Sequence, residues 1–365
     1  MLRRLTILIT TLGSLAATLA TSSPARAMPT VPVYTDGSVL ATLHRIVTIG
    51  STVDPLNGDV NPYGLDVARA THPPLAAGDL VICNFNDSGN VQGTGTTIVA
   101  LHPVPGATPL HIAGAPSLLG CNALALGPTD NIWAAAFAAN DNPIVTPGGV
   151  VATTLPGGPW RHPFGEIFAW RAAPGSLGAF YESNAADGTI VRITIFPGPK
   201  FVYEIIARGF AVNGGAPGSI LGPSGLQYDA RRDRLFIVDG ASNSVVVFER
   251  VSRIPAGGID VRGAGFFSGA YASLARLVYA GAPLNGPISS ALLPGGHLVV
   301  GNTLDPNGQN LMVELGPNGR LLDVVNVDTG AAGAIFGMVA TGSFDFDTKL
   351  YFNDDNANAL EVLTR

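Results

Sequence analysis

The chain has 365 residues, and 26 acidic against 20 basic side chains give it a formal net charge of −6. It carries no stripe rich in Lys and Arg, which argues against nucleic acids and anionic membranes as partners. Hydrophobic residues make up 47% of the chain and charged residues 13%, a balance that disordered chains lack. The 46 Gly and 28 Pro therefore indicate many turns between strands.

The N-terminus has the pattern of an export signal. Arg3 and Arg4 precede an apolar run over residues 5–20, and the segment 21–27 ends in a small-x-small sequence. The run is shorter than the ~20 residues that a membrane-spanning helix needs, and no later segment is apolar for long enough. We predict a signal peptide at 1–27, a single mature domain at 28–365, and a periplasmic or secreted location without a membrane span.

One order of elements recurs along the chain: a turn, an apolar strand, a polar hairpin, a second strand, a polar turn and a third strand. It is clearest where "LFIVDGASNSVVVF" joins two apolar runs through a small polar turn. Six copies are present, and the second is the weakest. In chain order they lie at residues 61–101, 121–137, 162–195, 222–250, 286–315 and 336–363.

Most copies are followed by a further short apolar run, such as "FVYEIIARG" at 201–209; after the weakest copy only "VVATTLP" at 150–156 fits. No such run follows the last copy, whereas an unpaired run, "VLATLHRIVTIG", lies at 39–50. No segment of useful length has the helical pattern that a parallel α/β sheet would require. The repeats therefore predict an all-β fold: a six-bladed β-propeller with four-stranded blades, closed by the N-terminal strand in the last blade.

The repeat sequences resemble those of known propeller families. "LFIVDGASNSVVVF" (235–248) resembles NHL repeats, "GPSGLQYDARRDRLFIVD" (222–239) resembles the gluconolactonase and senescence-marker group, and "NALALGPTDNIW" (122–133) resembles blades of streptogramin lyases. The resemblance extends over most of residues 35–365 and implies the propeller architecture. It also implies a possible metal site, since the lactonase and lyase groups hold a metal with Asn, Asp, Glu or His near the channel.

The chain has two cysteines, Cys83 and Cys121. In the oxidising compartment that an export signal implies, such a pair usually forms a disulfide. A reactive thiol would need a basic partner close by, and the sequence shows none. We therefore predict a disulfide between these two residues.

Propellers bind ligands at the mouth of the central channel, where the innermost strands begin. The residues that follow the opening turn of each copy are the candidates for a binding mouth: Tyr63, Asn122, Phe164, Ser224, Ile288 and Phe336. Four of them are aromatic or aliphatic, and only Asn122 and Ser224 offer a side-chain oxygen. This mixture is typical of a ligand site. The leading hypothesis is a small molecule or a protein bound at this mouth, with no cofactor and no metal.

The alternative is a metal-dependent lyase or lactonase that uses Ca²⁺ or Mg²⁺, and whether the protein is an enzyme stays open. Candidates for catalysis are His162, next to the mouth, and Asp66 and Glu166, which would act as general bases if turned inward. Each also has an ordinary interpretation, as a turn histidine bonded to backbone or as a polar position on a strand. The six His show no short metal-ligand spacing.

A polar residue recurs near the end of the second strand in most copies: Asn84, Asn184, Asp239, Asn302 and Asn353. Asn and Asp side chains bond readily to nearby backbone groups and favour turns. We interpret this series as part of the architecture rather than as a ring of ligands.

Overall fold

The computed structural model of the protein describes residues 37–155, 157–198 and 200–365. The predicted signal peptide, residues 1–27, lies outside this part. The described residues form an all-β fold whose helices are short 3₁₀ turns: η1 (Leu40–Thr42), η2 (Pro116–Leu118), η3 (Val251–Arg253), η4 (Ala272–Leu274) and η5 (Asp345–Asp347). None of the described helices has the length and hydropathy to cross a membrane.

Six sheets, called blades 1 to 6 here, follow one another along the chain, and their strands are given from the innermost outward. The first three blades are β2 (Val60–Val67), β3 (Leu80–Asn86), β4 (Thr97–Leu101), β5 (Leu110–Gly114); β6 (Cys121–Leu126), β7 (Ile132–Ala136), β8 (Ile144–Val145), β9 (Val151–Thr153); and β10 (Pro163–Ala169), β11 (Gly178–Asn184), β12 (Thr189–Phe196), β13 (Lys200–Arg208). The last three are β14 (Pro223–Asp229), β15 (Arg234–Asp239), β16 (Ser244–Glu249), β19 (Ala275–Ala280); β20 (Ser289–Leu292), β21 (Leu298–Gly301), β22 (Asn310–Leu315), β23 (Leu321–Asp328); and β24 (Ile335–Thr341), β25 (Lys349–Asp354), β26 (Ala359–Thr364), β1 (Arg45–Ser51).

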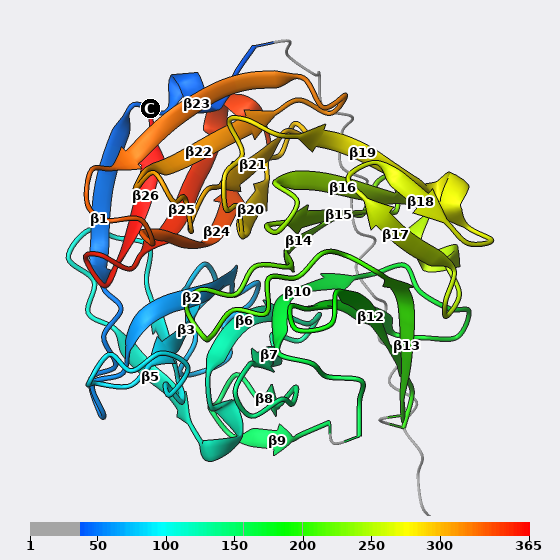
Figure 1. Cartoon of the computed structure of the whole chain (residues 1–365). Coiled ribbons are helices and arrows are strands. Elements are labelled where there is room, and N and C mark those ends of the chain that lie inside the picture. Colours follow the sequence, from blue (N-terminus) through cyan, green and yellow to red (C-terminus); the bar gives the residue numbers. More distant parts are fainter. Residues whose placement is uncertain (1–36, 156, 199) are drawn as a thin grey trace, which may run out of the picture. The chain divides into compact units, whose positions relative to one another are not determined.

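The innermost strands of the six blades surround a common channel. Each contacts the next in the order β2, β6, β10, β14, β20, β24 and back to β2, and Figure 1 shows the six sheets arranged around one centre. Six apolar clusters fill the spaces between neighbouring blades, and a seventh lies at the start of the inner strands. The described residues thus form a six-bladed propeller, which confirms the fold predicted from the repeats.

The inner strands approach each other so closely that one position on each must be small. These residues directly follow the predicted mouth residues in sequence: Gly64, Ala123, Gly165, Gly225, Ser289 and Gly337. A Cβ atom on Gly165 would overlap the carbonyl oxygen of Ser224, and one on Gly337 would overlap that of Tyr63. The narrow channel therefore depends on glycine at these two positions.

Side chains of the second strands join neighbouring blades at one shared register position. Cys83, Ser183 and Asn353 each lie one residue before the partner of the inner-strand residue that precedes the predicted mouth residue. These inner-strand residues are Pro62, Pro163 and Ile335. The Ser183 hydroxyl donates to the carbonyl oxygen of Ser224 at 2.8 Å, and Asn353 bonds the backbone of blade 1 in the same way. Cys83 forms the predicted disulfide with Cys121, with the Cα atoms 5.2 Å apart. The disulfide thus replaces a hydrogen bond between two blades.

Two blades depart from the expected pattern of four regular strands. In blade 2 the outer strands β8 and β9 have only two and three residues, which agrees with the weakness of that copy. Blade 3 gains a hairpin, β17 (Ile259–Gly263) and β18 (Phe266–Ser268), which is inserted between β16 and β19 and pairs with the outer edge of β13. The hairpin covers an edge that would otherwise be open.

The N-terminal strand is the outermost strand of blade 6. β1 pairs antiparallel with β26, from Arg45 opposite Thr364 to Ser51 opposite Ala359. This pairing joins the two ends of the described chain in one sheet. The strand begins later than the apolar run at 39–50, because the first part of that run forms η1.

A buried carboxylate holds the segment that precedes β1. Glu314 on β22 accepts hydrogen bonds from the Ser38 hydroxyl and from the backbone N–H groups of Val39 and Leu40, at 2.5, 3.0 and 2.9 Å. Nδ1 of His297 lies 2.6 Å from the same carboxylate. Burial alone would raise the pKa of Glu314, but these hydrogen bonds outweigh it and lower the pKa.

Gly165→Ala should lower the free energy of unfolding by about 2–3 kcal/mol, because the new methyl group forces β10 away from β14. Urea unfolding followed by circular dichroism measures this. Gly37→Ala is the control, since a Cβ there meets nothing within 4 Å. Equal stability of the two variants would contradict the close approach of the inner strands.

Glu314→Gln should cost about 2 kcal/mol of stability at pH 7, because hydrogen bonds to a charged group are lost. The folded pKa of Glu314 is lowered, so its contribution is present above the unfolded pKa of about 4.3 and is lost as the pH falls through the folded pKa. The difference from the native chain should therefore shrink below pH 4 in urea titrations. A difference that stays constant down to pH 3 would exclude this role.

Candidate functional site

The structure brings the six predicted mouth residues together but buries them. All six have an exposed fraction of 8% or less. The ring of Tyr63 stacks on Phe336 with centroids 3.6 Å apart and on Phe85 at 4.3 Å. With Phe164, Ile288 and several neighbours these rings form one apolar cluster, named the aromatic plug here. The side chains expected to line an open mouth therefore fill it.

The two polar residues of the predicted mouth use their donors on backbone. The Asn122 amide donates to the carbonyl oxygen of Phe164 at 3.1 Å, and the Ser224 hydroxyl donates to that of Val238 at 3.2 Å. Both side chains thereby bond the strands around them. The Asn122 amide oxygen is buried without a hydrogen-bond partner, and Asn122 belongs to the lining of the channel.

A cavity of about 80 Å³ lies in the channel beside the plug. Its polar lining includes Glu166, Gln227 and Ser290, and one oxygen of Glu166 and the hydroxyl of Ser290 are buried without a hydrogen-bond partner. A space of this size holds a few water molecules. It is too small for an organic ligand of the size that protein pockets usually bind.

The three candidate catalytic residues have separate partners. His162 stacks on Phe137 with centroids 4.4 Å apart, and its backbone N–H bonds Asn140. Asp66 accepts a hydrogen bond from the backbone N–H of Leu126 in blade 2 at 2.7 Å, and burial raises its pKa. Glu166 bonds Asn142 instead. Among residues 37–155, 157–198 and 200–365, no three His, Cys, Asp or Glu side chains are grouped as a metal site would require.

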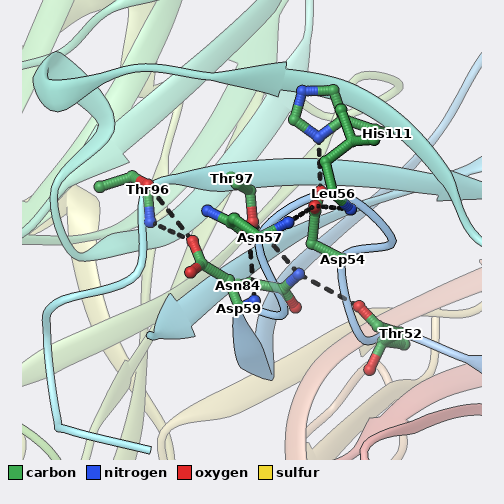
Figure 2. Close-up of polar contacts among 9 residues, drawn as sticks. All are labelled: Thr52, Asp54, Leu56, Asn57, Asp59, Asn84, Thr96, Thr97 and His111. Atoms are coloured by element: carbon green, nitrogen blue, oxygen red, sulfur yellow. Dashed lines mark hydrogen bonds and ion pairs between the residues drawn. The ribbon is translucent and has the colours of Figure 1, made fainter. Parts of the chain in front are cut away.

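Three histidines that the sequence left without a role lie next to carboxylates: His102 beside Asp79, His111 beside Asp54 and His297 beside Glu314. In the loop 52–59, shown in Figure 2, one oxygen of Asp54 lies 2.5 Å from Nδ1 of His111 on β5. In the same loop Asp59 accepts a hydrogen bond from the backbone N–H of Thr96 at 2.7 Å. These bonds tie the loop that enters blade 1 to the outer strands of that blade, which is a structural role.

A larger space lies between blades 2 and 3, at the opposite ends of the inner strands. It is a groove of about 830 Å³, named the lateral groove here. The stacked rings of Trp133 and Phe180, 4.1 Å apart, form part of its wall. Its other lining residues are Gly127, Pro128, Thr129, Asn131, Ile144, Ala152, Thr153, Trp170, Leu177, Ile195, Phe196, Gly198 and Phe201.

Sequence reasoning missed the lateral groove, although one signal for it was present. The second repeat is the weakest and its outer apolar run is short. Because β8 and β9 are correspondingly short, blade 2 leaves part of the facing surface of blade 3 uncovered. Trp170 and Leu177 on the loop after β10 are 46% and 58% exposed at the rim.

The ring and its channel define the class of this protein, a six-bladed β-propeller. No family model matches the chain, and no curated protein matches its sequence. A virginiamycin B lyase from Staphylococcus aureus is 15% identical with a TM-score of 0.52, over 88% of this chain and 99% of the lyase. An aldose sugar dehydrogenase from Streptomyces coelicolor, solved with PQQ, is 16% identical with a TM-score of 0.52, over 87% and 98%.

A chain from a nidogen/laminin complex is also similar, at 12% identity and a TM-score of 0.52, over 82% of this chain and 98% of that one. Two of these relatives in fold are enzymes and the third is part of a protein complex. At such low identity the likeness shows the fold alone, because one fold supports many functions.

Phe164→Ala should lower the free energy of unfolding by about 3–5 kcal/mol, since it removes a buried ring from the aromatic plug. Phe346→Ala is the control, because that ring is 69% exposed and surface substitutions usually change stability by less than ~0.5 kcal/mol. Denaturant unfolding of both variants measures the difference. A Phe164→Ala variant as stable as the native chain would restore the open-mouth hypothesis.

Proposed function

We propose that this protein is an exported binding protein and that its ligand lies in the lateral groove. The observation that carries the proposal is the groove itself, since about 830 Å³ is within the usual volume range of small-molecule sites. The channel mouth, the site favoured by the sequence, would have to break the aromatic plug to admit a ligand. The lateral groove requires no such rearrangement.

The lining of the lateral groove indicates the chemistry of the ligand. None of its lining residues is charged, and Trp133, Trp170, Phe180, Phe196 and Phe201 offer aromatic surface. Burying a charge against such a wall would be costly, whereas ring systems pack well on it. We therefore expect an uncharged, apolar molecule that contains rings, with Asn131 or Thr153 as hydrogen-bond partners for a polar substituent.

Export is supported by two features of the chain. The Cys83–Cys121 disulfide is the kind of bond that persists in oxidising compartments, and residues 1–27 have the pattern of a signal peptide. A periplasmic or secreted protein of this kind would meet its ligand outside the cytoplasm. A metal-dependent lyase or lactonase has less support, because the candidate catalytic residues do not converge.

Leu177→Asp should weaken binding of the neutral dye Nile red at least about tenfold, because the new charge at the rim must be desolvated beside the ligand. Binding is measured by dye fluorescence and by quenching of tryptophan emission. Leu56→Asp is a matched control, since this leucine is 74% exposed and belongs to the loop between β1 and β2. Equal loss of binding in both variants, or no saturable binding by the native chain, would refute the lateral groove as the ligand site.

A further inference from the structure

Two buried glutamates face blade 2 at the contact that also forms the lateral groove. Glu166 on β10 and Glu182 on β11 are directly opposite each other in the sheet. The side-chain amide of Asn142, from the loop between β7 and β8, donates to Glu166 at 3.0 Å and also to Glu182. The second oxygen of each carboxyl group is buried and has no partner, and the same is true of the Asn142 amide oxygen.

No positive charge in the described part of the chain compensates this pair. Among the described residues, no Lys, Arg or His forms an ion pair with either glutamate. The charge that acts on Glu182 from blade 2 is Asp141, which is also negative. On β12 the residue opposite Glu182 is the apolar Val191. The channel wall near Glu166 is uncharged, with Leu65, Leu124, Gln227, Ser290 and Met338.

Burial raises the pKa of Glu166 to about 8. Burial and the neighbouring Glu166 raise the pKa of Glu182 well above its usual value. The pair therefore keeps at least one proton at neutral pH. When that proton leaves, two uncompensated charges remain in an apolar contact, and such charges are stabilised only by hydration.

The pair and the lateral groove are two ends of one contact between blades. Phe180 and Glu182 lie on the same face of β11, two residues and about 7 Å apart, and Phe180 stacks on Trp133 in the groove wall. On blade 2, Asn142 is followed closely by Ile144, which also lines the groove. Glu166 lines the channel cavity and can be hydrated from there, whereas Glu182 is buried and does not belong to the lining of that cavity. Water that hydrates Glu182 must therefore separate the surfaces of blades 2 and 3 that also hold the lateral groove in shape.

We propose that the protonated Glu166–Glu182 pair keeps blade 2 closed against blade 3 and that loss of its proton releases the ligand from the lateral groove. The inference rests on the proposed function, because it concerns the regulation of the same site. The closed contact between blades 2 and 3 stabilises both the protonated form of the glutamate pair and the ligand bound in the lateral groove. Ligand binding therefore raises the proton affinity of the pair, and by thermodynamic reciprocity a rise in pH weakens ligand binding.

The test is the affinity for Nile red from pH 6 to pH 9.5. For the native chain we expect the affinity for Nile red to fall about tenfold as the Glu166–Glu182 pair ionises. This loss corresponds to a pKa of the pair that is about one unit higher in the bound state than in the free state. Glu182→Gln keeps the size of the side chain and removes the carboxyl group that the channel cavity does not reach. Glu166 still ionises in this variant, because burial raises its pKa, but it is hydrated from the channel, so the affinity should stay near the pH 6 value. Glu361→Gln on β26 is the matched control, because burial also raises the pKa of that glutamate, and it should keep the native pH dependence.

Infrared spectroscopy gives a second readout that does not depend on affinity. The carbonyl band of a protonated carboxyl group should be present at pH 7, weaken in Glu182→Gln, and titrate about one pH unit higher with Nile red bound. If no variant binds Nile red at pH 6, the proposed function and this inference fail together. If the native chain binds equally well at all pH values, or Glu182→Gln keeps the native pH dependence, the inference alone is overturned.

Discussion

The structure depends on how closely six inner strands approach one axis. Glycine at positions 165 and 337 lets the backbone of one strand lie against a carbonyl group of the next. The side chains that enter so narrow a channel fill it, and Tyr63, Phe164 and Phe336 pack in the aromatic plug instead of lining an opening. A cavity of only about 80 Å³ remains beside them. In the proposed function, space for a ligand therefore comes from the periphery of the ring.

Blade 2 provides that space because neighbouring blades pack face to face. β12 and β13 of blade 3 have eight and nine residues, whereas β8 and β9 of blade 2 have two and three. The outer part of blade 3 therefore extends past its neighbour, and aromatic side chains that would be covered in a regular ring line the lateral groove. The lateral groove therefore results from the short outer strands of blade 2. The other blades of the ring hold the strands around the groove in place.

Much of the fold could be predicted because each blade is a local unit of sequence. The starts of the inner strands could be placed as well, and the six predicted mouth residues share one register position. Their burial could not be predicted, because it depends on distances between strands that are far apart in the chain. Glu166 was a candidate, but its contacts with Glu182 and Asn142 depend on strand register and on blade packing. The polar series predicted at the ends of the second strands shows the same limit, because it included Asn353. Strand pairing puts the next residue, Asp354, opposite Ile335, and the Asn353 side chain instead bonds the backbone of blade 1.

Carboxyl groups that are buried without a cation lower the stability of a folded protein. Well-packed apolar residues of similar size at the same positions often make the protein more stable. Two other carboxyl groups of the ring have such partners: the half-buried Glu204 has Arg192 at 2.6 Å, and the buried Glu314 has His297 and two backbone N–H groups. The contact between blades 2 and 3 combines an uncompensated pair with short outer strands. Segments that open for ligands come from the less stable parts of a structure. In the proposed mechanism, the ring thus acquires a binding site because one contact between blades is weakened, while apolar clusters fill the spaces between the other blades.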